Sequence, residues 1–467
     1  MKLSRRSAMT SCSAAILVGM APRAAWGRTE ADVVIIGAGL AGLYAATLLE
    51  ASGMKTIVIE GEDRVGGRLH TLDDLPGRPE AGGIQVGTGY HRLRSIAAKL
   101  GVGLDEGPGG GAGAVESRNA LFKIGGQTVT ETQWPTSSAN HLSEREKKFL
   151  PLALDFLYAT KLPKLSAPEA WMTAEPAQDI SYAQALIQAG ASNEALRLIE
   201  ANLNGNRLTE MSQLSVMRSL AFYRSGPGPT ATIRGGSQRL PEAMAAGLMK
   251  SPRLKHFVTA IREDKTGVSI TTNLGILHAR HVICTIPFAA LRHIHLEAAI
   301  ASPVATMIAS LPYTRASFAY LSATDAFWNT DGFAETLWTD DPLLGRIFVL
   351  GDSPPMLKLW TTGAGADLLD RMKPHQAATE IVARIESTRP AAKGKLRVER
   401  LFSWQKSPFA RGIYHHIGTG QATTLAIAAQ TIGTRIHFAG EHLAQASTGM
   451  EGALESGERV ARNIIAL

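Results

Sequence analysis

The stretch Val33-Val34-Ile35-Ile36-Gly37-Ala38-Gly39-Leu40-Ala41-Gly42-Leu43 decides the fold of this chain. Its four apolar residues in a row are typical of a strand buried in a parallel sheet. The glycines that follow have G-x-G-x-x-G spacing, and a helix is expected from Leu43 to Leu49. A second apolar strand, Thr56 to Ile59, ends in the acid Glu60. Strand, turn, helix and second strand together predict a dinucleotide-binding βαβ unit.

Each glycine of this unit has a separate expected role. Gly37 permits the tight turn, Gly39 lets the backbone approach a pyrophosphate, and Gly42 allows close packing of helix on strand. The helix N-terminus presents unpaired N–H groups and a positive dipole to the phosphates. Glu60 is placed to accept hydrogen bonds from a ribose diol.

The residues after Glu60 distinguish between dinucleotides. Arg64-Val65-Gly66-Gly67-Arg68 pairs two glycines with two arginines, so that a backbone can approach an anion beneath a guanidinium. A basic surface turn is the alternative interpretation of this segment. With both motifs in place, the chain resembles the flavin-containing amine oxidase family, which includes monoamine, polyamine and L-amino-acid oxidases. The resemblance implies that the cofactor is FAD.

The C-terminal segment extends the resemblance. Ile436-His-Phe-Ala-Gly-Glu441 is expected to be a strand ending in Gly-Glu, and Gly449-Met-Glu-Gly-Ala453 is expected to open a helix that ends near Ile465. In the family, this helix directs its N-terminus at the flavin pyrimidine, where its dipole stabilises negative charge on the reduced ring. The motifs and the resemblance together imply FAD contacts from Gly37, Gly39, Leu40, Ala41, Gly42, Glu60, Arg68, Gly83, Gln85, Val258, Gly440, Glu441, Gly449 and Met450.

The expected fold class is α/β, a Rossmann-type FAD-binding domain of the amine oxidase kind with an interleaved α+β substrate domain. We assign residues 28–90, 230–300 and 431–467 to the FAD-binding domain. Residues 91–229 and 301–430 form the expected substrate-binding domain, with helical spacing from 143 to 220 and strands from 305 onward. The glycine-rich segment from Gly101 to Gly126 is expected to be a loop.

The resemblance also implies which residues surround the reaction. Tyr414 takes the place of an aromatic residue facing the flavin, and Trp404 and Phe318 complete the candidate catalytic set. Phe318 stands where many members have a lysine bonded through water to flavin N5. In the family a pair of aromatic residues surrounds the substrate amine, and Gly449 leaves one side of this pair open. Ile413 replaces the cysteine of covalent members, so non-covalent FAD is expected.

The implied reaction is transfer of a hydride from the carbon beside an amine to flavin N5, giving an imine that water hydrolyses. Oxygen or an electron-carrier protein reoxidises the flavin. Whether the substrate is an amine or an amino acid depends on a carboxylate-binding arginine, for which the candidates are Arg92, Arg224, Arg315 and Arg411. Two alternatives stay open: a desaturase or porphyrinogen-type oxidase that acts on C–C bonds, and a non-catalytic FAD-binding protein.

Composition excludes several other classes. The net charge of +7 is spread along the chain without a basic block, so no nucleic-acid partner is expected.

Residues 1–27 have the pattern of a twin-arginine signal peptide around Arg5-Arg6, which predicts a periplasmic or secreted protein. An ordinary secretory signal or an uncleaved anchor is the alternative. We expect no membrane-spanning segment in the mature chain and no metal site. Assembly into a homodimer is an open alternative.

Overall fold

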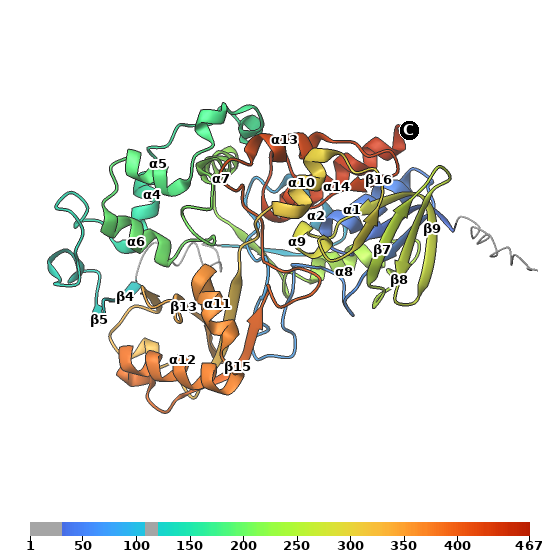
Figure 1. The fold of residues 1–467 in the computed structure, drawn as a ribbon. Coiled ribbons are helices and arrows are strands. Elements are labelled where there is room, and N and C mark those ends of the chain that lie inside the picture. Colours follow the sequence, from blue (N-terminus) through green and yellow to red (C-terminus); the bar gives the residue numbers. More distant parts are fainter. Residues whose placement is uncertain (1–29, 108–119) are drawn as a thin grey trace, which may run out of the picture.

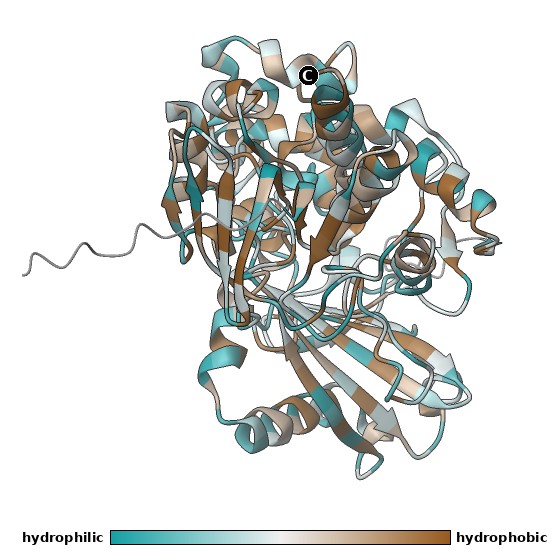
Figure 2. Cartoon of the chain, turned by 90° about the vertical axis from the view of Figure 1, so that its right-hand side faces the viewer, coloured by the Kyte–Doolittle hydropathy of each residue, from teal (hydrophilic) through white to brown (hydrophobic). Residues whose placement is uncertain are grey.

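Two large β-sheets, each with its own covering helices, organise the chain in this computed structural model, which describes residues 30–107 and 120–467 (Figure 1). The first sheet is built from the beginning, middle and end of the chain, and the second from the segments between them. Helices α4, α5, α6 and α7 form a third region in Figure 1. Brown segments of high hydropathy run along strands of both sheets (Figure 2).

The first sheet has the strand order β10-β7-β8-β9-β1-β2, and β16 also pairs with β9. Strands β1, β2 and β16 run parallel to their partners, whereas β7, β8 and β9 form an antiparallel meander. The bounds are β1 Ala31–Ile36, β2 Thr56–Ile59, β7 Val258–Glu263, β8 Val268–Thr272, β9 Gly275–Cys284, β10 His295–Glu297 and β16 Ile436–Phe438. The expected βαβ unit therefore forms, with Val33 paired to Thr56 and Ile36 to Ile59.

Two helices from opposite ends of the chain pack together against this sheet. Helix α1 (Leu40–Ala51) lies beside α14 (Gly449–Ile465), so the blue and red ends of the ribbon meet in Figure 1. A Cβ added at Gly457 would lie 2.4 Å from the carbonyl oxygen of Ala41, so only glycine permits this approach. Helix α1 begins three residues before the expected start, whereas α14 has the expected bounds.

The second sheet has the order β15-β11-β14-β13-β12-β4-β5 and is antiparallel except where β4 pairs with β12. Its bounds are β4 Ala120–Ile124, β5 Gln127–Val129, β11 Ala316–Ala323, β12 Thr336–Thr339, β13 Arg346–Asp352, β14 Pro355–Thr362 and β15 Leu396–Ser403. Helices α11 (Gly363–Arg371) and α12 (Pro374–Thr388) pack against its strands.

The remaining elements connect and cover the sheets. The longer helices are α2 His91–Lys99, α4 Leu154–Ala159, α5 Tyr182–Gln188, α6 Asn193–Ala201, α7 Gln213–Ser225, α8 Arg239–Ala246, α10 Ser302–Ser310 and α13 Ala422–Gln430. Short α9 (Phe288–Leu291) follows β9, and β3 (Leu104–Glu106) pairs with β6 (Ala231–Ile233). Helix α2 packs against α14, although the expected boundary at residue 90 assigns it to the substrate domain.

Two local expectations are wrong. The segment Gly101 to Gly126 is not simply a loop, because β3 lies within it and β4 begins at its far end; residues 108–119 lie outside the described part. Pairing with β6 and β12, which lie far away in the sequence, supplies the hydrogen bonds that these short strands need. The apolar residues from Leu254 to Ile261 also predict a strand, but β7 begins only at Val258, because Lys255 has a φ of 59° that interrupts extended backbone.

Candidate active site between the two sheets

A cavity with a volume of about 1040 Å³ is lined by residues from both halves of the molecule. Its walls include the glycine-rich turn after β1, the segment from Gly82 to Gln85, the loop from Pro408 to His416 and the N-terminus of α14. This volume lies at the upper end of the roughly 300–1,000 Å³ of ordinary ligand pockets. It therefore offers room for a dinucleotide and a small second ligand.

The cavity brings together nearly all of the site residues expected from the sequence. The members that line it are Gly37, Gly39, Leu40, Ala41, Glu60, Arg68, Gly83, Gln85, Val258, Trp404, Tyr414, Gly440, Glu441, Gly449 and Met450. Gly42 and Phe318 do not line it. Gly42 has the packing role expected for it, since an added Cβ would lie 2.0 Å from the carbonyl oxygen of Gly37.

The nucleotide end of the cavity is a cradle of backbone and one carboxylate. Gly39 pairs with Gly66 across the opening, and a Cβ at Gly39 would meet only the Gly66 oxygen, at 3.9 Å. Glu60 accepts hydrogen bonds from the N–H groups of Ala38 at 2.8 Å and Glu62 at 2.9 Å. The free space at Gly39 and the N-terminus of α1 fit an approaching pyrophosphate.

Arg68 and Glu441 join three segments that are distant in the sequence. The Arg68 guanidinium donates to the carbonyl oxygen of Ile413 at 2.9 Å and lies 3.2 Å from Glu441. Glu441 also lies 2.7 Å from Nδ1 of His415. Burial opposes ionisation of Glu441, but His415 and Arg68 hold the pKa of this carboxyl far below its usual range. The network therefore fixes the backbone on both sides of Tyr414.

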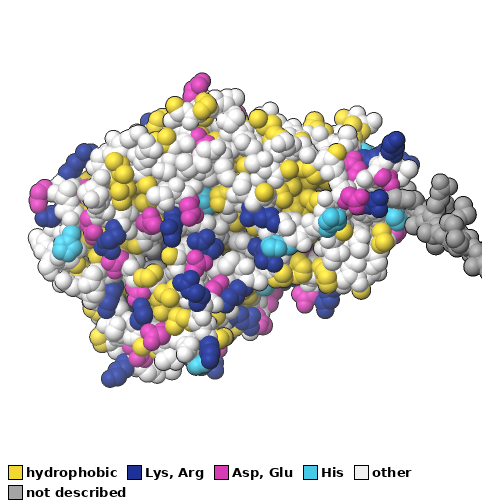
Figure 3. Space-filling view, viewed as in Figure 1, with side chains coloured by type: hydrophobic (Ala, Val, Ile, Leu, Met, Phe, Trp, Pro, Cys, Tyr) yellow, Lys and Arg dark blue, Asp and Glu magenta, His cyan; other side chains and the backbone are white. Residues whose placement is uncertain are grey.

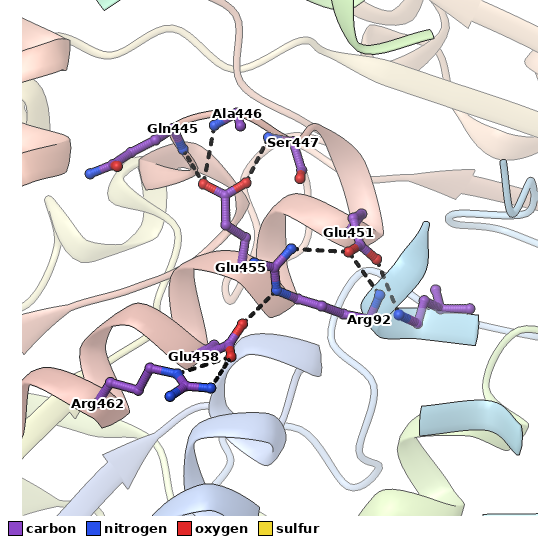
Figure 4. Close-up of polar contacts among 9 residues, drawn as sticks. Arg92, Gln445, Ala446, Ser447, Glu451, Glu455, Glu458 and Arg462 are labelled. Atoms are coloured by element: carbon purple, nitrogen blue, oxygen red, sulfur yellow. Dashed lines mark hydrogen bonds and ion pairs between the residues drawn. The ribbon is translucent and has the colours of Figure 1, made fainter. Parts of the chain in front are cut away.

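Helix α14 is held in place by acids along its own length (Figure 4). Glu455 accepts hydrogen bonds from the N–H groups of Gln445, Ala446 and Ser447, the turn that leads into the helix. Arg92 of α2 contacts Glu451 at 3.2 Å and Glu458 at 2.6 Å. These bonds fix the N-terminus of α14 at the cavity wall, and they commit Arg92 to a structural role.

The second sheet holds the segment that precedes the Gly82–Gln85 wall of the cavity. Trp404 donates from Nε1 to the carbonyl oxygen of Ala81 at 2.6 Å. Tyr320 and Lys358 both donate to the carbonyl oxygen of Glu80, at 2.8 and 2.7 Å. These donors stand on β11, β14 and the turn after β15, so the second sheet positions the Gly82–Gln85 wall of the cavity.

Lys358 is a buried residue behind the cavity wall that the sequence interpretation missed. Its ammonium group lies 4.4 Å from the ring centroid of Phe318 and 4.9 Å from that of Trp360. Phe318 itself is buried in β11, so the structure places it behind the wall and gives it no contact with the cavity. A lysine inside the otherwise apolar run Met356 to Trp360 was the available signal, because buried lysines are rare without a partner or a function.

Burial lowers the pKa of Lys358 to about 7, although the nearby Glu80 opposes this shift. Because unfolded lysine titrates near 10.4, the unfolded chain binds more protons between pH 7 and about 10. The buried charge of Lys358 therefore lowers the free energy of unfolding at pH 7 and below. As the pH rises through this window, the free energy of unfolding increases. We expect Lys358→Met to remove this recovery when urea unfolding is measured across the window. Lys406→Met, at an exposed lysine, is the control and should leave it intact.

The other candidate arginines for binding a substrate carboxylate lie in different surroundings. Arg315 lies 2.9 Å from Asp367, Arg224 is exposed, and Arg411 lines the cavity. Arg346, which the sequence interpretation did not consider, also lines the cavity and donates to Asn204 at 2.7 Å. The opening expected beside Gly449 is occupied in part by Tyr90, whose hydroxyl lies 3.1 Å from the position of an added Cβ.

Among residues 30–107 and 120–467, no group of three or more His, Cys, Asp or Glu side chains is arranged to hold a metal ion. Within the same ranges, no helix has both the length and the apolarity to cross a bilayer. Basic and acidic side chains are interspersed on the face shown in Figure 3.

Comparison with known proteins shows the family of this chain. The family model for flavin-containing amine oxidoreductases matches residues 40–465. The chain is 24% identical to amine oxidase [flavin-containing] B of Cavia porcellus, covering 94% of this chain and 86% of that protein. It is 25% identical to an L-amino-acid oxidase of Siganus canaliculatus, covering 93% and 85%.

Solved structures show the same fold at lower identity. Cyclohexylamine oxidase from Brevibacterium oxydans IH-35A superposes with a TM-score of 0.75 at 22% identity, covering 93% of this chain and 99% of that one. Putrescine oxidase bound to putrescine gives a TM-score of 0.72, also at 22% identity, with 94% and 99% covered.

The described residues fit FAD as a non-covalent cofactor. The open space at Gly39, the carboxylate of Glu60 and the N-terminus of α14 would hold its polar parts. Ile413, where the resemblance implies the cysteine of covalent members, lines the same cavity. Within the described part of the chain the free cysteine is Cys284, which is buried in β9. The matched family and this geometry agree: the chain belongs to the flavin-containing amine oxidoreductases, FAD-dependent enzymes that act on CH–NH or CH–NH2 donors.

Proposed function

We propose that this protein oxidises a small amine at the carbon that carries the nitrogen. Bound FAD would accept a hydride from that carbon at N5, leaving an iminium that loses a proton and is hydrolysed by water to a carbonyl compound. The observation that carries the proposal is one continuous cavity that joins the dinucleotide cradle to Tyr414 and Trp404. A small substrate in this cavity would lie directly against the cofactor.

The chain's own residues would position the amine and keep it neutral. Trp338, Trp360, Trp404 and Tyr414 line the cavity, and an aromatic wall of this kind disfavours an ammonium through desolvation. Trp404 is itself fixed by its bond to Ala81, and the backbone beside Tyr414 is fixed by Arg68. No nucleophile or proton-transferring dyad is needed at the reacting carbon.

Anaerobic mixing of the yellow holoenzyme with a panel of amines and amino acids tests this function. We expect bleaching of the flavin absorbance by amines, with a rate that rises with pH as the bound amine loses its proton. Tyr414→Ala should lower kcat/KM for the best amine about 10- to 100-fold, because misplacing a reacting group costs rates of that order. Ile427→Ala, at an exposed position on α13, is the control.

The same panel contains the outcome that would contradict the proposal. Bleaching by polyenes or porphyrinogens, with none by amines, would assign the site to oxidation of C–C bonds. Failure of every compound to bleach the flavin would leave a cofactor-binding role without catalysis. Equal rates for Tyr414→Ala and the parent protein would remove Tyr414 from the substrate site.

We further propose that oxygen or an electron-carrier protein accepts the electrons, and that a homodimer is the assembly to test first. The twin-arginine pair Arg5-Arg6 lies outside the described residues. It supports export of the folded, FAD-loaded protein to the periplasm or beyond, because a dissociable cofactor has to be bound before translocation.

A further inference from the structure

A buried arginine that the proposed reaction does not use lies beside the N-terminus of α14. Arg218 stands on α7, is only 3% exposed, and lines the cavity together with Thr448 and Gly449. Its guanidinium donates from Nη2 to the carbonyl oxygens of Ala444 and Ser447, both at 2.7 Å. Its Nε has no hydrogen-bond partner. The arginine therefore lies at the cavity wall with part of its hydrogen-bonding capacity unused.

The charge of Arg218 is not neutralised by an ion pair. In the part of the chain that the structure describes, no carboxylate accepts a hydrogen bond from this guanidinium. The acids that act on it from a distance are bonded to other groups, Glu441 to Arg68 and His415, and Glu455 to three backbone N–H groups. Burial lowers the pKa of Arg218 to about 10, so the guanidinium stays protonated at neutral pH.

The turn that leads into α14 is held by three side chains from different elements. Glu455 accepts from its N–H groups (Figure 4), whereas Arg218 and Trp171 donate to its carbonyl oxygens. Trp171 donates from Nε1 to the carbonyl oxygen of Gln445 at 2.7 Å. The ring of Trp171 lies 5.0 Å from Cζ of Arg218. These contacts fix the guanidinium close to the first turn of α14.

Two positive groups thus lie at the same wall of the cavity. The first N–H groups of α14 form the positive end of the helix dipole, and Arg218 adds a full charge beside them. Burying both without an anion costs free energy of folding, and such an arrangement is typical of a site where negative charge is bound or develops. The hydride that leaves the amine carbon carries two electrons and one proton, so its transfer to FAD adds one negative charge to the cofactor.

We infer that Arg218, together with the N-terminus of α14, stabilises the negative charge that bound FAD gains on reduction, and so raises its reduction potential. This inference rests on the proposed function only for the acceptance of a hydride by FAD, and the identity of the amine does not enter it. The competing use of the same charge is to bind a carboxylate on the substrate.

The test measures the reduction potential of bound FAD by anaerobic, dye-coupled titration in the absence of any amine. Arg218→Met should reduce the preference of the protein for reduced over oxidised FAD about 10-fold, a fall of about 30 mV for this two-electron couple. Arg218→Gln keeps a donor for the backbone carbonyls and removes the charge, so it should lower the potential equally. Arg218→Lys keeps the charge and should retain most of the potential.

Two further variants separate the charge of Arg218 from its structural bonds. Arg292 also donates to backbone carbonyls, those of Ile308 and Leu311, but it does not line the cavity, so Arg292→Met should leave the potential unchanged. Trp171→Phe keeps the ring and removes the bond to the turn, and should also leave it unchanged. A parental potential in both Arg218→Met and Arg218→Gln, or an equal fall in Arg218→Lys and Trp171→Phe, would overturn the inference.

Because the titration uses no amine, its result is distinct from failure of the proposed function. If no amine bleaches the flavin while Arg218→Met still lowers the potential, the reaction is wrong and the role of Arg218 stands. If amines bleach the flavin and the potential does not move, the reaction stands and the inference is wrong. An unchanged potential with a raised KM for amino acids alone would assign Arg218 to the substrate carboxylate instead.

Discussion

Gly39→Val is expected to yield a protein that folds normally but is purified without colour. The backbone at Gly39 has φ −79° and ψ 179°, which a valine adopts without strain, and an added Cβ would have only one ordinary contact within the protein. The new methyl groups would instead fill the space that the pyrophosphate needs. We expect the Kd for FAD to rise at least about 100-fold, while the melting temperature of the apoprotein stays within about 2 °C.

Two other glycines give the matched comparisons. Gly42→Ala places a Cβ 2.0 Å from the Gly37 carbonyl oxygen, so it should lower apoprotein stability by about 1–3 kcal/mol as well as FAD affinity. Gly107→Ala meets nothing within 4 Å and should alter neither property. A yellow Gly39→Val protein with parental FAD affinity would mean that the cofactor does not pass this turn.

Arg68→Met should have the second large effect, on stability and on cofactor binding together. The substitution leaves the buried Glu441 carboxylate with His415 alone and leaves the carbonyl oxygen of Ile413 without its Arg68 bond. Removing one partner of a buried ion pair costs about 3–5 kcal/mol, and the remaining His415 bond places this case at about 3 kcal/mol. Urea unfolding of the holoenzyme and titration of the apoprotein with FAD measure the two effects.

An exposed pair provides the control for Arg68. Arg234 lies 2.8 Å from Asp105, but both side chains are more than half exposed, at 69% and 52%. Arg234→Met should therefore cost less than about 1 kcal/mol and leave FAD affinity unchanged. Losses of equal size in the two variants would show that the Arg68–Glu441 contact contributes no more than a surface ion pair.

The elements and residues that would bind FAD could be predicted closely from the local sequence. Strand β2 and helix α14 have the bounds expected from their apolar spacing and small residues, and all but two of the expected site residues line one cavity. These features depend on neighbours a few residues away. A glycine needed for a turn, or an acid at the end of a strand, is visible in a short window because the requirement is local.

The features of the second sheet and of the helical insertion depended on tertiary structure alone. Strand β4 forms in a glycine-rich region because β12 pairs with it from more than 200 residues away. Lys358 lies against Phe318 because the register of β11 and β14 sets Phe318 opposite Trp360 and Tyr320 opposite Lys358. Asp155 of α4 lines the cavity and accepts a hydrogen bond from Tyr182 of α5. Each of these contacts joins distant segments through packing and strand register, and a linear pattern does not encode which distant residue becomes the neighbour.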